Sequence, residues 1–164
     1  MRMTRTSGIL AGLGLFVLGA GTPAAQAPAA SPQLANVKSL TCTFPVAVAA
    51  TWDKETGEPN VAVRKSAVLT FKFDQIDTSE SSARFVGPTA APEHVVAQLS
   101  GWNLHFMDIR PSGSLSITTV FAQYTKEPKL KAVYTRTDYL QVSIPGFASQ
   151  PDVSQRYGEC EIVS

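Results

Sequence analysis

Apolar and polar side chains alternate along most of the chain beyond residue 39, with the period of two that is typical of β-strands with one buried face. The longest run alternates Leu40, Cys42, Phe44, Val46 and Val48 with threonine, alanine and Pro45. Because proline has no backbone N–H, this strand should either lie at a sheet edge or contain a bulge at Pro45. We predict a long first strand whose buried face carries the run from Leu40 to Val48.

Further strands are predicted where the same alternation, or a short apolar run, lies between turn residues. They fall at residues 65–74, 83–87, 93–99, 102–107, 115–122, 129–137 and 155–163. Residues 93–99 could instead form one helical turn opened by Pro92, but a strand is favoured. In residues 129–137 apolar side chains occupy both faces, so the pattern does not decide whether Leu130, Ala132 and Tyr134 or their neighbours point inward.

Short turn segments separate these strands. They include a polar turn at residues 53–60, a two-residue hairpin at Ser100-Gly101, a Pro-Ser-Gly-Ser turn at residues 111–114, and a loop at residues 138–153 with a short strand at residues 140–144 as an option. No segment shows a convincing helical period. The sequence therefore predicts an all-β fold, a single antiparallel domain of about eight strands. A small meander barrel, lipocalin-like in shape, is favoured, and a β-sandwich is second.

The N-terminal region has the layout of a secretory signal peptide. Arg2 and Arg5 precede an apolar stretch at residues 8–21, and small residues follow at residues 22–30. The apolar stretch is shorter than the ~20 residues of an ordinary membrane-spanning helix. We expect residues 1–29 to be removed by cleavage after Ala27 or Ala29, with an uncleaved anchor as the alternative. Residues 30–36 are then a flexible segment and residues 37–164 one β domain.

Charge narrows the choice of partners. The 164-residue chain has 14 Lys and Arg against 13 Asp and Glu, a formal net charge of +1. Loss of Arg2 and Arg5 with the signal peptide leaves 12 basic residues and a net charge of −1. Such a chain has no basic field that would attract nucleic acid. We therefore expect an exported protein, periplasmic or extracellular, with no nucleic-acid partner and no stable membrane span.

Cys42 and Cys160 are the only cysteines and lie near the two ends of the expected domain. In an oxidising compartment such a pair is usually a disulfide. The bridge would close a loop of about 119 residues and would require the two Cα atoms to lie roughly 4.4–6.8 Å apart. The first and last strands would then be neighbours, as in a closed barrel. Reactive thiols and metal ligands are the alternatives, but no third cysteine or nearby histidine supports them.

Candidate ligand-binding residues are few and their signals are weak. They are His105 and Trp102 on one predicted strand, and Tyr134 and Arg136 in the C-terminal third, where aromatic and basic residues interleave. His94 is the only other histidine. The chain has no nucleophile elbow, phosphate-binding loop, dinucleotide fingerprint or zinc spacing. We predict no catalytic residue, no metal ligand and no cofactor.

Two pairs of charged residues have structural interpretations. Asp74 and Asp77 lie at a strand end, where aspartate commonly bonds the local backbone of a turn, although acid–base chemistry or calcium binding is an alternative. Asp108 and Arg110 are two residues apart on a strand, so they share a face and can form an ion pair. A role in anchoring a ligand is the alternative for that pair.

These observations favour an exported, non-catalytic binding module of the cell envelope. It would be either a small-ligand carrier or a protein-binding barrel of the inhibitor type. Lipocalin-like carriers and small inhibitor barrels are analogies of the expected fold alone, since no stretch of the chain matches a family signature. The expected partner is an unknown small molecule or envelope protein, and the contact regions would be residues 53–60, 111–114 and 138–151. One alternative is a small secreted enzyme that uses His94 or His105 with a nearby aspartate. Another is a structural envelope-associated protein.

Overall fold

The computed structural model describes residues 32–64, 66–89, 91–140 and 150–163. The predicted signal peptide and its cleavage site lie outside these residues. No helix in the described ranges is long and apolar enough to cross a membrane.

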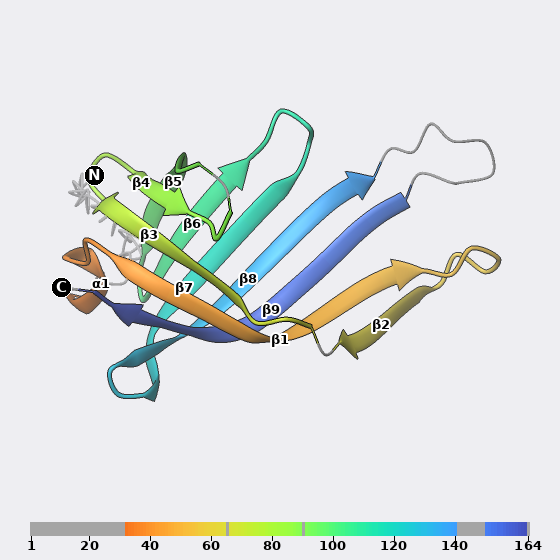
Figure 1. The fold of residues 1–164 in the computed structure, drawn as a ribbon, viewed down its shortest axis with the longest axis horizontal. Helices are drawn as coiled ribbons and strands as arrows, with labels where there is room; N and C mark the ends of the chain where they lie inside the picture. Colours follow the sequence, from red (N-terminus) through yellow and green to blue (C-terminus); the bar gives the residue numbers. More distant parts are fainter. Residues whose placement is uncertain (1–31, 65, 90, 141–149, 164) are drawn as a thin grey trace, which may run out of the picture.

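The described chain forms nine antiparallel strands and one short helix. In chain order these are α1 (Pro32–Ala35), β1 (Leu40–Trp52), β2 (Pro59–Arg64), β3 (Leu69–Asp77), β4 (Ser82–Val86), β5 (Glu93–Ser100), β6 (Asn103–Ile109), β7 (Leu115–Lys126), β8 (Lys129–Leu140) and β9 (Gln150–Ile162). Strands β3 to β9 pair consecutively, β3 and β9 both pair with β1, and β2 adds to β1 (Figure 1). The predicted all-β meander barrel is confirmed: eight strands close it, and β2 is an extra strand.

Strand β1 closes the barrel because it pairs with different strands along its length. Its first half, Leu40 to Phe44, pairs with β3, and its second half pairs with β2, while β9 follows both halves. The β1–β9 register shifts between Thr43 and Val46, which confirms the bulge expected at Pro45. The bulge also changes which side chains point inward. Beyond it Ala47 is buried and Val46 is 43% exposed, so the expected burial of Val46 and Val48 is wrong.

Several element boundaries differ from the prediction. Strand β2 overlaps the end of the turn expected at residues 53–60 and continues through residues 61–64, where no strand was predicted; all six of its residues are exposed. A loop was expected at residues 138–153. Instead β8 extends to Leu140 and β9 begins at Gln150, and the two strands pair with each other at both ends of this range. The optional strand at residues 140–144 lies almost wholly outside the described residues. The β5–β6 hairpin has the expected two-residue loop, but it consists of Gly101 and Trp102, since Ser100 still pairs with Asn103.

The end of the barrel at the start of β1 is filled by α1 and the residues after it. Leu34 has no exposed surface and Val37 is only 4% exposed, and both pack into the hydrophobic core. Gln33 Nε2 donates a hydrogen bond of 2.5 Å to the hydroxyl oxygen of Tyr124 on β7. Helix α1 lies in the part of the expected flexible segment that the structure describes, and its Leu34 covers this end of the barrel (Figure 1).

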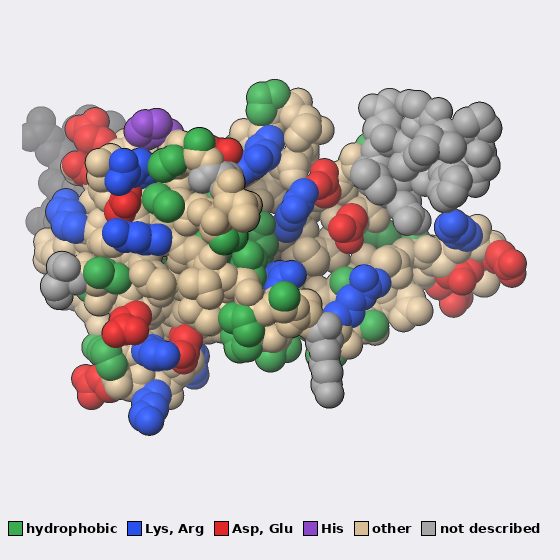
Figure 2. Space-filling model, viewed as in Figure 1, with side chains coloured by type: hydrophobic (Ala, Val, Ile, Leu, Met, Phe, Trp, Pro, Cys, Tyr) green, Lys and Arg blue, Asp and Glu red, His purple; other side chains and the backbone are tan. Residues whose placement is uncertain are grey.

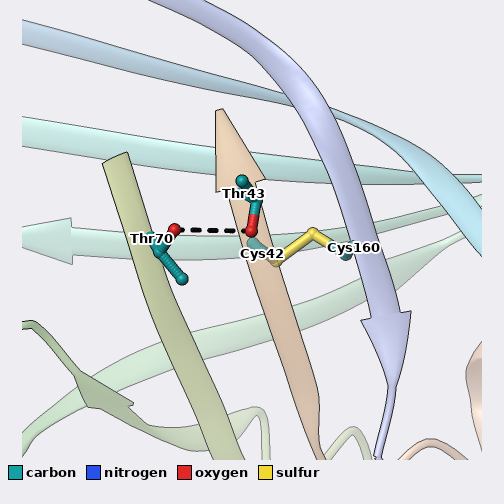
Figure 3. Close-up of a disulfide and its surroundings, with 4 residues drawn as sticks. All are labelled: Cys42, Thr43, Thr70 and Cys160. Atoms are coloured by element: carbon teal, nitrogen blue, oxygen red, sulfur yellow. Dashed lines mark hydrogen bonds between the residues drawn. A yellow bond between two sulfur atoms is a disulfide. The ribbon is translucent and has the colours of Figure 1, made fainter. Parts of the chain in front are cut away.

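The predicted disulfide is confirmed. Cys42 and Cys160 face each other directly in the β1–β9 register, and both are fully buried. Their Cα atoms are 4.0 Å apart, slightly closer than the expected range. Figure 3 shows the bridge crossing from β1 to β9, while Thr43 on β1 faces Thr70 on β3, with their hydroxyl oxygens 3.4 Å apart. The covalent bond thus joins the first and last strands of the barrel.

Candidate ligand site at the open end of the barrel

A cavity of about 290 Å³ opens at the end of the barrel away from α1. Its lining comes from β3 to β8 and from the β6–β7 turn. Two backbone hydrogen bonds stabilise this turn, from Arg110 N–H to Ser114 O and from Gly113 N–H to Arg110 O. The lining residues are Phe73, Phe85, Val95, Phe106, Asp108, Arg110, Ser112, Ser114, Ser116, Thr118, Tyr134, Arg136 and Asp138. The cavity therefore extends from the β6–β7 turn into the barrel interior.

Strand β7 places polar side chains inside the barrel. Thr118 is 2% exposed and Val120 is fully buried, so the even-numbered residues of β7 point inward. Ser114 and Ser116 share this face and line the cavity with Thr118. The more apolar set that includes Leu115 and Ile117 lies on the outer face of the barrel, so β7 departs from the usual apolar-in arrangement.

The strand register stacks the lining in layers. Phe106, Thr118 and Tyr134 are direct neighbours across β6, β7 and β8. One step toward the opening, Asp108, Ser116 and Arg136 are neighbours in the same way. The inner of these layers is thus mainly aromatic and the outer one mainly charged, and each contains a hydroxyl group from β7.

Aromatic rings form the apolar floor. Phe73 and Phe106 stack with ring centroids 3.8 Å apart and an interplanar angle of 7°. Phe85 lies 5.6 Å from Phe73, and both belong to a larger cluster that also includes Phe71 and Tyr134. Phe73 and Phe106 are each only 2% exposed, so the ring surface that faces the cavity comes mainly from Phe85 and Tyr134, which are partly exposed.

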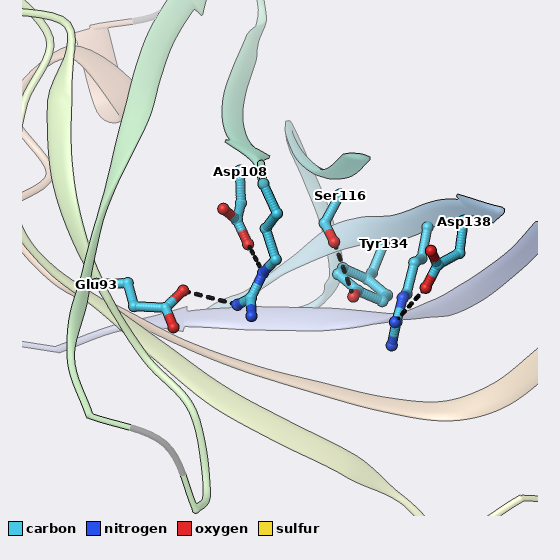
Figure 4. A network of polar contacts seen from close by, with 7 residues as sticks. Glu93, Asp108, Ser116, Tyr134 and Asp138 are labelled. Carbon is cyan, nitrogen blue, oxygen red and sulfur yellow. Dashed lines mark hydrogen bonds and ion pairs between the residues drawn. The ribbon is translucent and has the colours of Figure 1, made fainter. Parts of the chain in front are cut away.

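Ion pairs surround the mouth of the cavity. Arg110 donates from Nε to Asp108 at 3.0 Å and from Nη2 to Glu93 at 2.6 Å. Arg136 donates to Asp138 at 2.5 Å. In Figure 4 Glu93 and Asp108 lie on one side of the opening and Asp138 on the other, with Ser116 and Tyr134 between them.

These pairs set the electrostatics of the mouth. The hydrogen bond from Arg136 lowers the pKa of Asp138, and the bond to Asp108 raises the pKa of Arg110. The face shown in Figure 2 has acidic and basic side chains interspersed, without a broad area of one sign. The expected Asp108–Arg110 pair is present.

The structure places the four candidate ligand residues in two groups. Tyr134 and Arg136 line the cavity, and their contact with a ligand remains a prediction. Trp102 is 61% exposed in the β5–β6 turn. His105 lies on the outer parity of β6, where its Nδ1 is 3.0 Å from the hydroxyl oxygen of Thr119. Neither Trp102 nor His105 is among the cavity-lining residues of the described chain.

The remaining chemical candidates lie apart from the cavity. His94 is exposed on the outer parity of β5. Asp77 accepts backbone bonds from Ser79 and Glu80, the turn role expected of it, and the Ser79 hydroxyl is the largest cause of its lowered pKa. Asp74 was expected to do the same but forms a two-point pair with Arg84, at 2.6 and 2.9 Å. No cluster of three potential metal ligands occurs among the described residues.

Sequence reasoning missed the serines and threonine of the cavity wall. Ser112 and Ser114 were assigned to a turn, and Ser116 and Thr118 to an ordinary alternating strand. A signal was present, because hydroxyl residues recur at every second position from 112 to 118. Such a polar row in a strand of a closed barrel indicates an interior that is not filled by apolar side chains.

No known protein-family model matches the chain, and no curated protein is similar enough in sequence to count as a relative. The site must therefore be interpreted from its own geometry.

Proposed function

We propose that this protein is an exported, non-catalytic binding module that holds a small ligand in the open end of its barrel. One observation carries the proposal: the cavity combines an aromatic floor, a row of hydroxyl groups and an ion-paired mouth. Ligand sites in proteins are typically concave and apolar, with a few polar groups that fix orientation. Eight-stranded barrels are wide enough to hold one small ligand.

Binding fits the cavity better than catalysis does. The cavity lining contains neither histidine, and the acids in it, Asp108 and Asp138, are both held by arginines. A general base needs to be within hydrogen-bond reach of its substrate, and an enzyme that used His94 or His105 would have to work on the outer face. The buried disulfide is compatible with export to a periplasmic or extracellular compartment.

The ligand can be detected by native mass spectrometry of the mature protein, gently isolated from its source cells. We expect a small added mass that disappears on denaturation. The variant Ser116→Phe fills the cavity and should lose this mass. The adjacent variant Ile117→Phe adds a similar ring on the outer face and should keep it. A bare wild-type protein, or equal occupancy in both variants, would contradict the proposal.

A second candidate function is protein binding through β2. This strand has β1 as its only partner in the described sheet, so its other edge offers unpaired backbone groups. Val61 and Val63 lie on one face of it and are 65% and 75% exposed. Such an edge can accept an extended segment of another polypeptide as an added strand. An inhibitor-type barrel or a structural envelope protein would use this surface.

Crosslinking in source cells separates this candidate from ligand binding. If β2 carries a partner, Val61→Lys should abolish a specific crosslinked species of protein size. Val68→Lys should keep the species, because Val68 is similarly exposed, at 58%, but lies outside β2. A crosslinked species that both variants retain would exclude β2 as the contact.

A further inference from the structure

The wall of the cavity contains a hydroxyl group that has no protein partner in the ranges that the structure describes. Thr118 lines the cavity, is only 2% exposed, and its side chain makes no hydrogen bond within the described part of the chain. Its neighbour Ser116 differs, because the Ser116 hydroxyl is 3.2 Å from the hydroxyl of Tyr134. Among the described residues the one buried side-chain atom without a partner is Ser39 Oγ, so the Thr118 hydroxyl faces the cavity and is not enclosed in the core. The Thr118 hydroxyl is thus available to a ligand.

The surroundings of this hydroxyl favour a flat apolar group. Phe106 is the direct neighbour of Thr118 on β6, and Tyr134 is its neighbour on β8. Phe106 already stacks on Phe73 in parallel at 3.8 Å. Phe73 and Phe106 are each only 2% exposed, so a further aromatic ring would pack against Tyr134 and Phe85, the lining rings that are partly exposed. Ring surface and an available hydroxyl therefore lie side by side.

The charges at the mouth of the cavity disfavour an anion. Both arginines that line it are paired with carboxylates, Arg110 with Asp108 and Glu93, and Arg136 with Asp138. Two aspartates match the two arginines in the lining, and Glu93 adds one more negative charge beside it. A carboxylate or phosphate ligand would have to compete with these acids for the arginines, and moving it from water into the cavity is costly.

We propose that the cavity selects uncharged aromatic compounds that carry a hydrogen-bonding group on the ring, which pairs with the hydroxyl of Thr118. This inference rests on the proposed ligand-binding function and specifies the class of ligand. The ring packs against Phe85 and Tyr134, and its polar group reaches Thr118. Anionic relatives of the same ring bind more weakly, because the carboxylates beside the arginines repel them.

Three naphthalenes with a single different substituent test this selection. Fluorescence titration would compare 2-naphthol, 2-methylnaphthalene and 2-naphthoate on the mature, disulfide-bonded protein at neutral pH. We expect 2-naphthol to bind about five- to tenfold more tightly than the methyl compound, the effect of one neutral hydrogen bond. We expect 2-naphthoate to bind more weakly than either.

The variant Thr118→Val removes the hydroxyl and keeps the shape of the side chain. It should abolish the preference for 2-naphthol over 2-methylnaphthalene. Thr137→Val makes the same change at an exposed, outward-facing position of β8 and should retain the preference. An unchanged preference in Thr118→Val would overturn the role of this residue.

The outcomes separate this inference from the function on which it rests. Binding of 2-naphthoate as tight as that of 2-naphthol would overturn the proposed ligand class and leave a ligand-binding barrel. If none of the three compounds binds the wild-type protein, the proposed ligand class fails, whereas the proposed function fails only if the native protein also carries no small added mass.

Discussion

Gly158 allows β1 and β9 to approach each other closely at the bulge. A Cβ atom at this position would lie 2.0 Å from the carbonyl oxygen of Thr43 and 2.8 Å from Cα of Phe44. Both are backbone atoms of β1, so they cannot turn aside as the end of a side chain would. The absence of a side chain at residue 158 is thus a condition for closing the barrel beside the disulfide.

Gly158→Ala should therefore destabilise the protein by at least about 2 kcal/mol, the cost of overpacking a site that cannot relax. Urea unfolding measures this loss. Gly113→Asn is a suitable control, because Gly113 has open space around it and its φ of 88° is one that asparagine tolerates better than most residues. If the two variants have equal stability, the close approach at Gly158 does not matter.

We expect His105 to make the stability of the protein depend on pH, although it lies on the outer face of β6. Partial burial lowers its pKa below the usual 6.5. In the unfolded chain His105 has the usual pKa of 6.5, and in the folded protein its pKa is lower. At a pH between these two values the unfolded chain binds more protons than the folded chain, so the free energy of unfolding falls as the pH drops below 6.5. Above that pH this contribution is fully retained.

We expect the urea midpoint to decrease between about pH 7.5 and about pH 5.5, the range in which histidine titrates. His105→Gln should remove part of this decrease. His94→Gln should keep the wild-type decrease, since His94 is exposed. Identical decreases in the two variants would assign the effect to another group.

At the scale of elements, the sequence pattern predicts a strand where one face is buried and the other is not. It succeeds for β3, where Phe71 and Phe73 are buried between polar neighbours. It fails for β2, because all residues of that strand are exposed and no alternation arises. It does not indicate the inward face of β7, because the barrel interior at that strand is a cavity wall of hydroxyl groups.

The site was harder to predict than the fold. Tyr134 and Arg136 were found because aromatic and basic residues interleave there, and both line the cavity. His105 and Trp102 were chosen for their chemistry, but strand parity and a turn place them outside. Pairings across strands, such as Phe106 with Thr118, depend on register, and register depends on contacts between distant segments.

Helix α1 stabilises the barrel through one apolar side chain. Leu34→Ala should cost about 2–5 kcal/mol, the usual range for a fully buried leucine. Gln33→Ala, which removes only the surface bond to Tyr124, should cost less than about 1 kcal/mol. Thermal or urea unfolding would compare the two. Equal small losses would show that α1 does not contribute to the core in solution.

At the scale of the whole molecule, the fold depends on joining its two ends. The disulfide spans a sequence separation of 118 residues and lies in the strand pair that closes the barrel. In the chain-entropy account, closing a loop of this length in the unfolded state stabilises the fold by about 4–5 kcal/mol. By keeping β1 and β9 together, the bridge stabilises the closed sheet on which the open end of the barrel depends.

Cys42→Ala/Cys160→Ala should accordingly lower the free energy of unfolding by several kcal/mol, measured in urea. Wild-type protein unfolded in the presence of a reductant should show a similar loss. A variant as stable as the oxidised wild type would mean that backbone pairing of β1 with β9 suffices to close the barrel.

The central claim is that the open end of the barrel is a ligand site. Its most direct test is nuclear magnetic resonance of the ¹⁵N-labelled mature protein during a titration with 2-naphthol. We predict saturable shifts of backbone amides that cluster around Phe106, Thr118 and Tyr134 on β6, β7 and β8. Shifts confined to β2 or to the outer face around His105, or no saturable shift at all, would contradict the account.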